Sequence, residues 1–324
     1  MNLQNKIWIM LFALGIIMWG CDSLIYEDMA DCPQGVYVGF YSMTPCAVDS
    51  TFIGDVSDLH LFAFDDKDRL VSVTHREKVL LDKNFSLLVP VSNGYFSFIG
   101  WAGVNDNFST GEFKTGTTSK KDVMLALKSK NNQAFPLSDH KVWQGESPSI
   151  FLQDPVKVGS EYKHTSVNLR QVTNRINVIV ELHESVTDKS KPEDYTVEIA
   201  SGNGNINIDG SMPLNQQVLS YPSVVSYSAS SLKAQFSLMD LKTGYNNLIT
   251  VKNKESKTMV WQGDLLGSIL LKNNNVNLEC QNDFDVKFII KDKCLNCGTY
   301  ICWAIYVNDW LIHSYETELD GNSY

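Results

Sequence analysis

One cysteine near the start of the chain is placed for attachment of lipid. Lys6 precedes an apolar run over residues 7–19, and Gly20 and Cys21 follow it. A basic residue, a short apolar run and then a small residue are typical of a secretory signal peptide. The run is shorter than the roughly 20 residues that a membrane-spanning helix needs. The sequence therefore predicts that residues 1–20 are a signal peptide that is removed.

The pair Gly20 and Cys21 resembles the lipobox of bacterial lipoproteins, in which the cysteine thiol takes a diacylglyceryl group and signal peptidase cuts just before it. Met18 and Trp19 depart from that pattern, because Leu and then Ser or Ala are usual there. Each buried CH₂ of a palmitate-type chain contributes about 0.8 kcal/mol, so two or three chains anchor a protein firmly. We predict lipidation of Cys21. An ordinary secreted protein with a spare cysteine is the alternative.

Six further cysteines remain once Cys21 is assigned to lipid, and an even number in an exported protein fits disulfides. They are Cys32, Cys46, Cys280, Cys294, Cys297 and Cys302. Local pairing of Cys32 with Cys46 would close a loop of about 15 residues and contribute ~3 kcal/mol in the loop-entropy model. The connectivity of the other four stays open, and free buried thiols are the alternative. Cys294 and Cys297 form a CxxC, but no second CxxC or histidine follows at zinc-ligand spacing.

Local motifs for catalysis are missing from the sequence. The histidines are spread along the chain and form no HxH or HExxH; they are His60, His75, His140, His164, His183 and His313. No GxSxG, GxxxxGK or GxGxxG occurs either. We therefore predict no enzyme activity, no metal site and no cofactor. Five tryptophans fit a sandwich core better than a sugar-binding face; these are Trp101, Trp143, Trp261, Trp303 and Trp310.

Composition and charge describe a globular, acidic protein. The 324 residues are 44% hydrophobic and 11% aromatic, with a formal net charge of −10. Nucleic-acid binding relies on clustered Lys and Arg, so this balance argues against it. About 300 residues remain after the signal peptide, which suggests two domains of roughly 130–150 residues each. No second apolar segment is long enough to span a bilayer.

Short runs rich in β-branched and aromatic residues, separated by turn residues, predict an all-β protein built of sandwiches. The expected strands are residues 35–41, 58–64, 70–73, 85–91, 94–103, 123–127, 163–170, 173–182, 195–200, 205–208, 233–238, 247–251, 258–261, 285–290, 300–307 and 310–319. Residues 65–68 form a turn rather than a calcium loop, and Asn93-Gly94 marks a tight hairpin. Residues 264–271 are the one helical candidate. The predicted division is a tether at 21–34, a first domain at 35–171 and a second at 172–324.

With these residues in view, the chain resembles the minor-fimbrium anchoring subunits, the fimbrillin-associated anchor lipoproteins of type V fimbriae. The most specific stretches are Cys-Asp-Ser-Leu-Ile-Tyr-Glu-Asp at 21–28 and Asp-Cys-Pro-Gln-Gly-Val-Tyr-Val-Gly-Phe-Tyr at 31–41. The similarity continues at 59–65, 95–103, 169–180 and 305–310, in the order of the family. It thus covers nearly the whole chain after the signal peptide.

The resemblance implies two tandem transthyretin-like β-sandwiches on a lipoprotein that ties a fimbrial shaft to the outer membrane, on the cell surface, and limits its length. Shaft subunits of such fimbriae join by strand exchange, in which an extended segment completes the sheet of the next subunit. We expect the C-terminal strand at 311–319, or the sheet edge beside it, to meet the first shaft subunit. Its candidate residues are Trp310, Leu311, Ile312, His313, Ser314 and Tyr315. The N-terminal strand should stay in place, because the lipid needs it.

A different class of protein fits the same outline. Surface lipoproteins that bind glycans for nutrient uptake are also β-sandwiches behind a lipobox. Exposed, coplanar tryptophans would favour that alternative.

The lipid assignment is tested by Cys21→Ser, which removes the thiol that accepts the diacylglyceryl group. We expect both domains to fold while the protein leaves the membrane fraction, as measured by fractionation and immunoblotting. A variant that stays with the membranes would contradict lipid anchoring at this residue.

Overall fold

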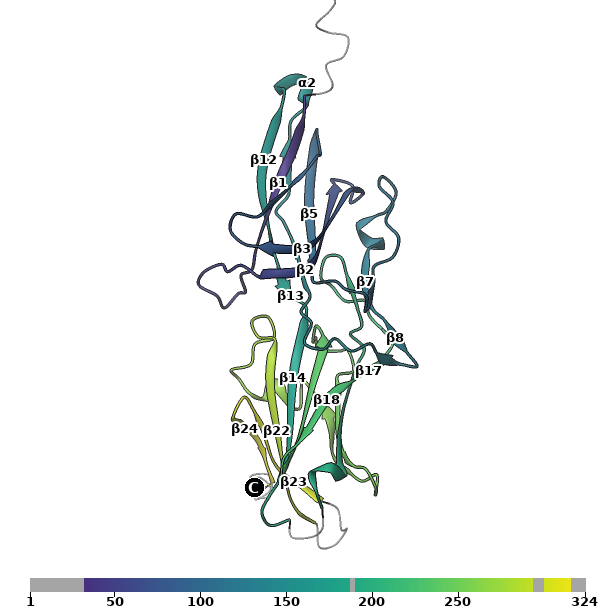
Figure 1. Ribbon diagram of the computed structural model, residues 1–324, viewed down its shortest axis with the longest axis vertical. Coiled ribbons are helices and arrows are strands. Elements are labelled where there is room, and N and C mark those ends of the chain that lie inside the picture. The colour runs from purple at the N-terminus through teal and green to yellow at the C-terminus, as the bar shows by residue number, and fades with distance from the viewer. Residues whose placement is uncertain (1–31, 187–189, 294–299, 316–324) are drawn as a thin grey trace, which may run out of the picture.

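The structure is a computed structural model that describes residues 32–186, 190–293 and 300–315. The signal peptide, Cys21 and most of the tether lie outside these residues. The described chain is elongated, with two β-sandwiches stacked along its long axis (Figure 1). None of its helices has the length and apolar character to cross a membrane.

The first sandwich pairs a three-stranded sheet with a larger one. The smaller sheet has the order β12-β1-β4, from β12 (Glu161–Asn168), β1 (Gln34–Tyr41) and β4 (Ser86–Val89). The larger sheet has the order β13-β10-β5-β2-β3, from β13 (Arg170–Gln171), β10 (Trp143–Glu146), β5 (Gly94–Ala102), β2 (Gly54–Asp65) and β3 (Leu70–Leu81). A further strand, β11 (Ile150–Leu152), pairs with β5, and the short helix α2 (Pro155–Val158) precedes β12. Alternate residues of β1 and β2, such as Val38 and Leu61, fill the core between the two sheets.

The second sandwich consists of two longer sheets. One has the order β18-β19-β14-β22-β23-β24, from β18 (Ser223–Tyr227), β19 (Ser231–Met239), β14 (Thr173–Leu182), β22 (Asp283–Lys293), β23 (Tyr300–Val307) and β24 (Trp310–Ser314). The other has the order β21-β20-β15-β17-β9-β8, from β21 (Met259–Asp264), β20 (Leu248–Asn253), β15 (Tyr195–Ser201), β17 (Leu219–Tyr221), β9 (Gln133–Ala134) and β8 (Ser129–Lys130). The period-two pattern of β14 buries Ile176, Val178 and Val180 against this second sheet. The predicted all-β sandwich fold is confirmed.

Strands from the first half of the chain also pair with strands from the second half. A small sheet joins β16 (Asn205–Asn207), β7 (Met124–Leu127) and β6 (Phe108–Ser109), and β9 pairs with β17. Short 3-10 turns lie at η1 (Lys120–Asp122), η2 (Pro192–Asp194) and η3 (Leu270–Lys272). The division near Gln171 therefore stays a prediction, because the pairings do not separate there.

One apolar core crosses from the first sandwich to the second. It runs from Phe62 and Trp101 in the first sandwich, through Leu125 of β7, to Ile176 and Phe284 in the second. Each fully buried large side chain contributes roughly 1.5–3 kcal/mol, so shared burial couples the two sandwiches.

Two local expectations differ from the structure. Asn93-Gly94 does not close a hairpin, because β4 pairs with β1 while β5 pairs with β2. The turn instead carries the chain from one sheet to the facing one, with Asn93 at φ 52°. Of the helical candidate at 264–271, only the 3-10 turn that begins at Leu270 forms. The turn at 65–68 is confirmed: Asp65 accepts hydrogen bonds from the backbone N–H groups of Lys67 (2.9 Å) and Arg69 (2.8 Å).

The expected Cys32–Cys46 disulfide is wrong. Cys46 bonds to Cys280, 234 residues away, with an S–S distance of 2.01 Å, and Cys32 is a free thiol. Cys46 lies in the loop between β1 and β2, which the Ser42–Thr51 bridge closes, and Cys280 lies in the loop before β22. The local guess failed because the covalent partner was chosen by closeness in sequence, whereas the fold brings distant loops together.

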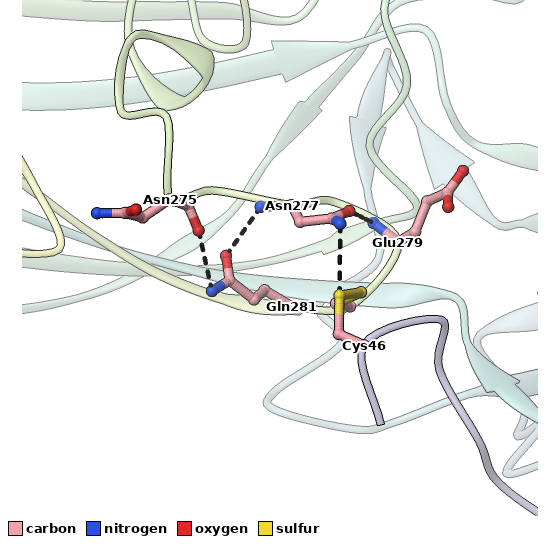
Figure 2. The surroundings of a disulfide bond; sticks show 6 residues. Cys46, Asn275, Asn277, Glu279 and Gln281 are labelled. Atoms are coloured by element: carbon pink, nitrogen blue, oxygen red, sulfur yellow. Dashed lines mark hydrogen bonds between the residues drawn. A yellow bond between two sulfur atoms is a disulfide. The ribbon is translucent and has the colours of Figure 1, made fainter. Parts of the chain in front are cut away.

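Figure 2 shows how the second of these loops is held in shape. Asn277 donates from its side chain to Cys46 Sγ at 3.4 Å and accepts from the Glu279 N–H at 3.0 Å. The Gln281 side chain accepts from the Asn277 N–H at 3.1 Å. The disulfide therefore joins the first sandwich to a preorganised loop of the second.

Replacing both partners, Cys46→Ser with Cys280→Ser, removes this cross-link. We expect the free energy of unfolding to fall by about 2–5 kcal/mol, because the unfolded chain regains freedom over a long loop. Guanidinium denaturation in buffer without added oxidant or reductant measures this fall in the free energy of unfolding. The matched control, Cys32→Ser, should leave the midpoint unchanged, and equal midpoints for the double variant and the parent would contradict a stabilising cross-link.

Candidate interaction surface

The predicted partner strand forms the edge of a sheet. β24 is the last strand of its sheet and pairs with β23 through a two-residue turn at Asn308 and Asp309. Both turn residues have positive φ, 48° and 62°, as a type I′ hairpin requires. An edge strand presents backbone N–H and C=O groups to which another chain can add.

The side chains of β24 divide into an exposed set and a set that packs on the core. Trp310 is 58% exposed and Leu311 is 47% exposed, and Tyr315 just beyond the strand is also exposed. Ile312 packs against the core. The His313 ring lies 5.4 Å from that of Trp261. The exposed set is thus apolar and aromatic, as in the centres of protein interfaces.

Ser314 is half-buried and closes the strand, opposite Ala304 of β23. The pairing register shifts between Ile305 and Tyr306, so β24 carries a bulge near Ile312. A short, bulged edge resists unspecific pairing, which favours a selective partner.

The direction of β24 follows from the pairings. β14 leaves the end of the first sandwich, β22 runs parallel to it, and β23 and β24 each reverse direction. β24 therefore runs away from the first sandwich. In Figure 1, β24 lies in the lower sandwich, whereas β1 begins at the top beside α2.

The N-terminal strand occupies the middle of its sheet. β1 pairs with β12 over eight residue pairs and with β4 over four. Val36 and Val38 are fully buried, and a Cβ at Gly35 would lie 2.7 Å from the Leu88 side chain. This strand is held on both sides by hydrogen bonds and packing.

The sheet that ends in β24 has a second edge, which was not expected from the sequence. β18 closes the opposite edge and exposes Val224, Val225 and Tyr227. The sequence signal for β18 was weak, because its five residues do not alternate between apolar and polar. The two adjacent valines after Pro222 are nevertheless typical of a strand. The two edges offer an internal comparison.

The tryptophans do not form a shared exposed face in the described part of the chain. Trp101 is buried, while Trp143, Trp261 and Trp303 are half-buried, and only Trp310 of the five is largely exposed. The arrangement on which the glycan-binding alternative depended is not assembled there.

Comparison with known proteins defines the class first. A Bacteroides thetaiotaomicron structure described as a candidate polysaccharide-binding protein superposes with a TM-score of 0.72 at 19% identity, covering 88% of this chain and 99% of that one. At that identity the likeness shows the fold alone. The fimbrial anchor protein Mfa2 from Porphyromonas gingivalis superposes with a TM-score of 0.79 at 33% identity, over 88% of this chain and all of the other. The class is that of two-sandwich β proteins found in fimbriae.

The family follows from the sequence comparisons. The model of the fimbrillin-A associated anchor proteins Mfa1 and Mfa2 matches residues 29–316. The minor fimbrium anchoring subunit Mfa2 of Porphyromonas gingivalis is 35% identical over 312 residues, which is 93% of this chain and 94% of that protein. The chain belongs to the family of fimbrillin-A associated anchor proteins. This is a family of structural fimbrial proteins rather than of enzymes.

Next to the edge strand, Cys302 of β23 is a buried free thiol. Burial raises the pKa of the Cys302 thiol to about 12. At pH 8 a thiol with that pKa is ionised in only about one molecule in 10⁴, and the thiolate is the reactive form. Cys294 and Cys297, its neighbours in sequence, lie outside the described residues.

We therefore expect iodoacetamide at pH 8 to modify Cys32 in the folded protein and to leave Cys302 unmodified until the protein is unfolded. Peptide mass spectrometry measures both sites in one sample, with the denatured protein as the control. Equal rates at Cys32 and Cys302 in the folded state would contradict the buried position of Cys302.

Proposed function

We propose that the protein is an outer-membrane lipoprotein that anchors a fimbrial shaft at the cell surface. In this proposal a lipid on Cys21 holds one end, and the β24 edge joins the first shaft subunit by strand complementation. The observation that carries the proposal is the placement of a fully paired β1 and an edge strand β24 toward opposite ends of the molecule (Figure 1).

The pairing of β1 supports its role as the fixed end. A pull on the N-terminal lipid would load β1, and the strand leaves its sheet only if the ladders to β12 and β4 both break. The disulfide between Cys46 and Cys280 would then pass the load from the first sandwich to the second without relying on packing alone.

The β24 edge supports its role as the junction. A shaft segment lying beside β24 would continue the sheet through backbone hydrogen bonds and would cover Trp310 and Leu311. Main-chain bonds of this kind provide affinity, while the exposed aromatic side chains provide selectivity.

In this proposal the same arrangement would also limit the length of the shaft. Strand exchange needs a subunit that releases a strand and a subunit that receives one. Because β1 stays paired on both sides, the protein offers the shaft one junction instead of two. Addition of subunits would stop where this protein is incorporated.

A charge placed on the edge tests the junction directly. Leu311→Lys puts an ammonium group where a partner strand would cover an apolar side chain, which weakens binding of the partner. Each 1.4 kcal/mol of lost binding free energy lowers the affinity about tenfold. We expect fimbriae to appear in the culture medium instead of on cells, with binding of purified shaft subunit weakened at least about tenfold. Stability should change by no more than about 0.5 kcal/mol, because the site is exposed.

The matched control is Val225→Lys on β18, the other edge of the same sheet, where the side chain is exposed to a similar extent, 43% against 47%. It should leave fimbriae attached. Loss of attachment with Val225→Lys but not with Leu311→Lys would assign the junction to β18. Retention by polysaccharide affinity gels, with fimbriae undisturbed by either variant, would favour the glycan-binding alternative.

A further inference from the structure

The β2–β3 hairpin of the first sandwich, seen in Figure 1, carries four residues with potential metal-ligand side chains in a two-by-two block. Asp58 and His60 of β2 lie directly opposite Glu77 and His75 of β3 in the antiparallel register. Because alternate residues of a strand point to one face, all four belong to the same face. The antiparallel pairing of the hairpin places His60 directly opposite His75.

Three of the four side chains converge. The His75 Nε2 lies 2.5 Å from Asp58 Oδ2, and the His60 Nε2 lies 2.7 Å from Asp58 Oδ1. The two imidazole rings stack with their centroids 4.4 Å apart. One donor atom from each residue lies within 4.8 Å of the other two. Around a tetrahedral Zn²⁺ with bonds of about 2.0–2.1 Å, ligand atoms lie about 3.3 Å apart, so small side-chain rotations suffice.

One carboxylate oxygen of the cluster has no hydrogen-bond partner. Asp58 Oδ1 is buried and accepts no hydrogen bond from the described residues, because the nearby His60 nitrogen is not aligned for one. The other carboxylate oxygen, Oδ2, is hydrogen-bonded to His75, so the pairing within the cluster is incomplete.

A plain ion pair explains this cluster less well. Pairing with the two histidines satisfies only Asp58 Oδ2, since the His60 Nε2 lies 2.7 Å from Oδ1 without forming a hydrogen bond to it. A dication between the three groups would satisfy the orphaned oxygen.

The cluster lies in a pocket that an ion can reach. Asn105, Asp106 and Thr110, from the segment that follows β5, line this pocket together with Glu77. The side chains of Asp58 and His60 are 16% and 21% exposed, and that of His75 is 43% exposed. Partial burial strengthens coordination, and the exposed histidine leaves a route from solvent.

We propose that Asp58, His60 and His75 bind one transition-metal dication, exemplified by Zn²⁺. Two imidazole nitrogens and one carboxylate suit Zn²⁺, whereas Ca²⁺ and Mg²⁺ prefer ligand sets made of oxygen. Three protein ligands leave a fourth position for water or for a side chain of a partner. The ion ties β3, the last strand of its sheet, to β2.

The experiment is calorimetric titration of the purified, chelator-treated protein with ZnCl₂, with CaCl₂ and MgCl₂ in parallel, together with thermal unfolding. We expect one Zn²⁺ per chain and a rise in the unfolding temperature, since a ligand that binds only the folded state stabilises it. His75→Ala and the isosteric Asp58→Asn should each weaken Zn²⁺ binding at least about tenfold.

The matched control is His164→Ala, which removes an exposed histidine from β12 of the same sandwich, where it stacks on Tyr37. It should bind Zn²⁺ as the parent does, and circular dichroism should show all three variants folded. No Zn²⁺ uptake by the parent protein would overturn the proposal. So would undiminished uptake by both site variants, or tighter binding of Ca²⁺ than of Zn²⁺.

Discussion

The apolar core shared by the two sandwiches is the constraint on which the rest of the molecule depends. Phe62 and Trp101 of the first sandwich belong to the same buried cluster as Ile176 and Phe284 of the second. Two domains on a flexible linker would not keep their ends at a set separation. Here shared burial is reinforced by the Cys46–Cys280 bond and by the Arg170–Asp240 ion pair at 2.6 Å, in which the carboxylate is almost fully buried. Breaking a buried ion pair of this kind costs free energy, so the boundary between the two sandwiches resists bending.

That coupled core gives meaning to the positions of the strands at either end. β1 is held on both sides, whereas β24 and β18 are each held on one side. Since unsatisfied backbone groups along an edge attract further strands, the sheet that contains β24 could be extended at these two edges. The bulge distinguishes β24 from β18, and the proposed junction rests on this difference and on the direction in which β24 runs.

The side chains with chemical potential are placed by the same architecture. Burial keeps the Cys302 thiol protonated beside the edge strand. The hairpin register stacks His60 on His75 above Asp58. Neither feature belongs to a catalytic arrangement within the described residues.

Much of this protein was determined by local sequence. Strands such as β14 and β19 were predictable because side chains of a strand alternate between core and solvent, and that alternation is written in neighbouring residues. Family membership was equally visible in residues 21–41 and in the later strands. Tertiary structure alone decided which strands are neighbours. It separated β4 from β5 across two sheets, joined Cys46 to Cys280 and brought His60 to His75. The reason is physical: periodicity reports burial within one strand, whereas pairing depends on the packing of the whole sheet, which no short stretch of sequence contains.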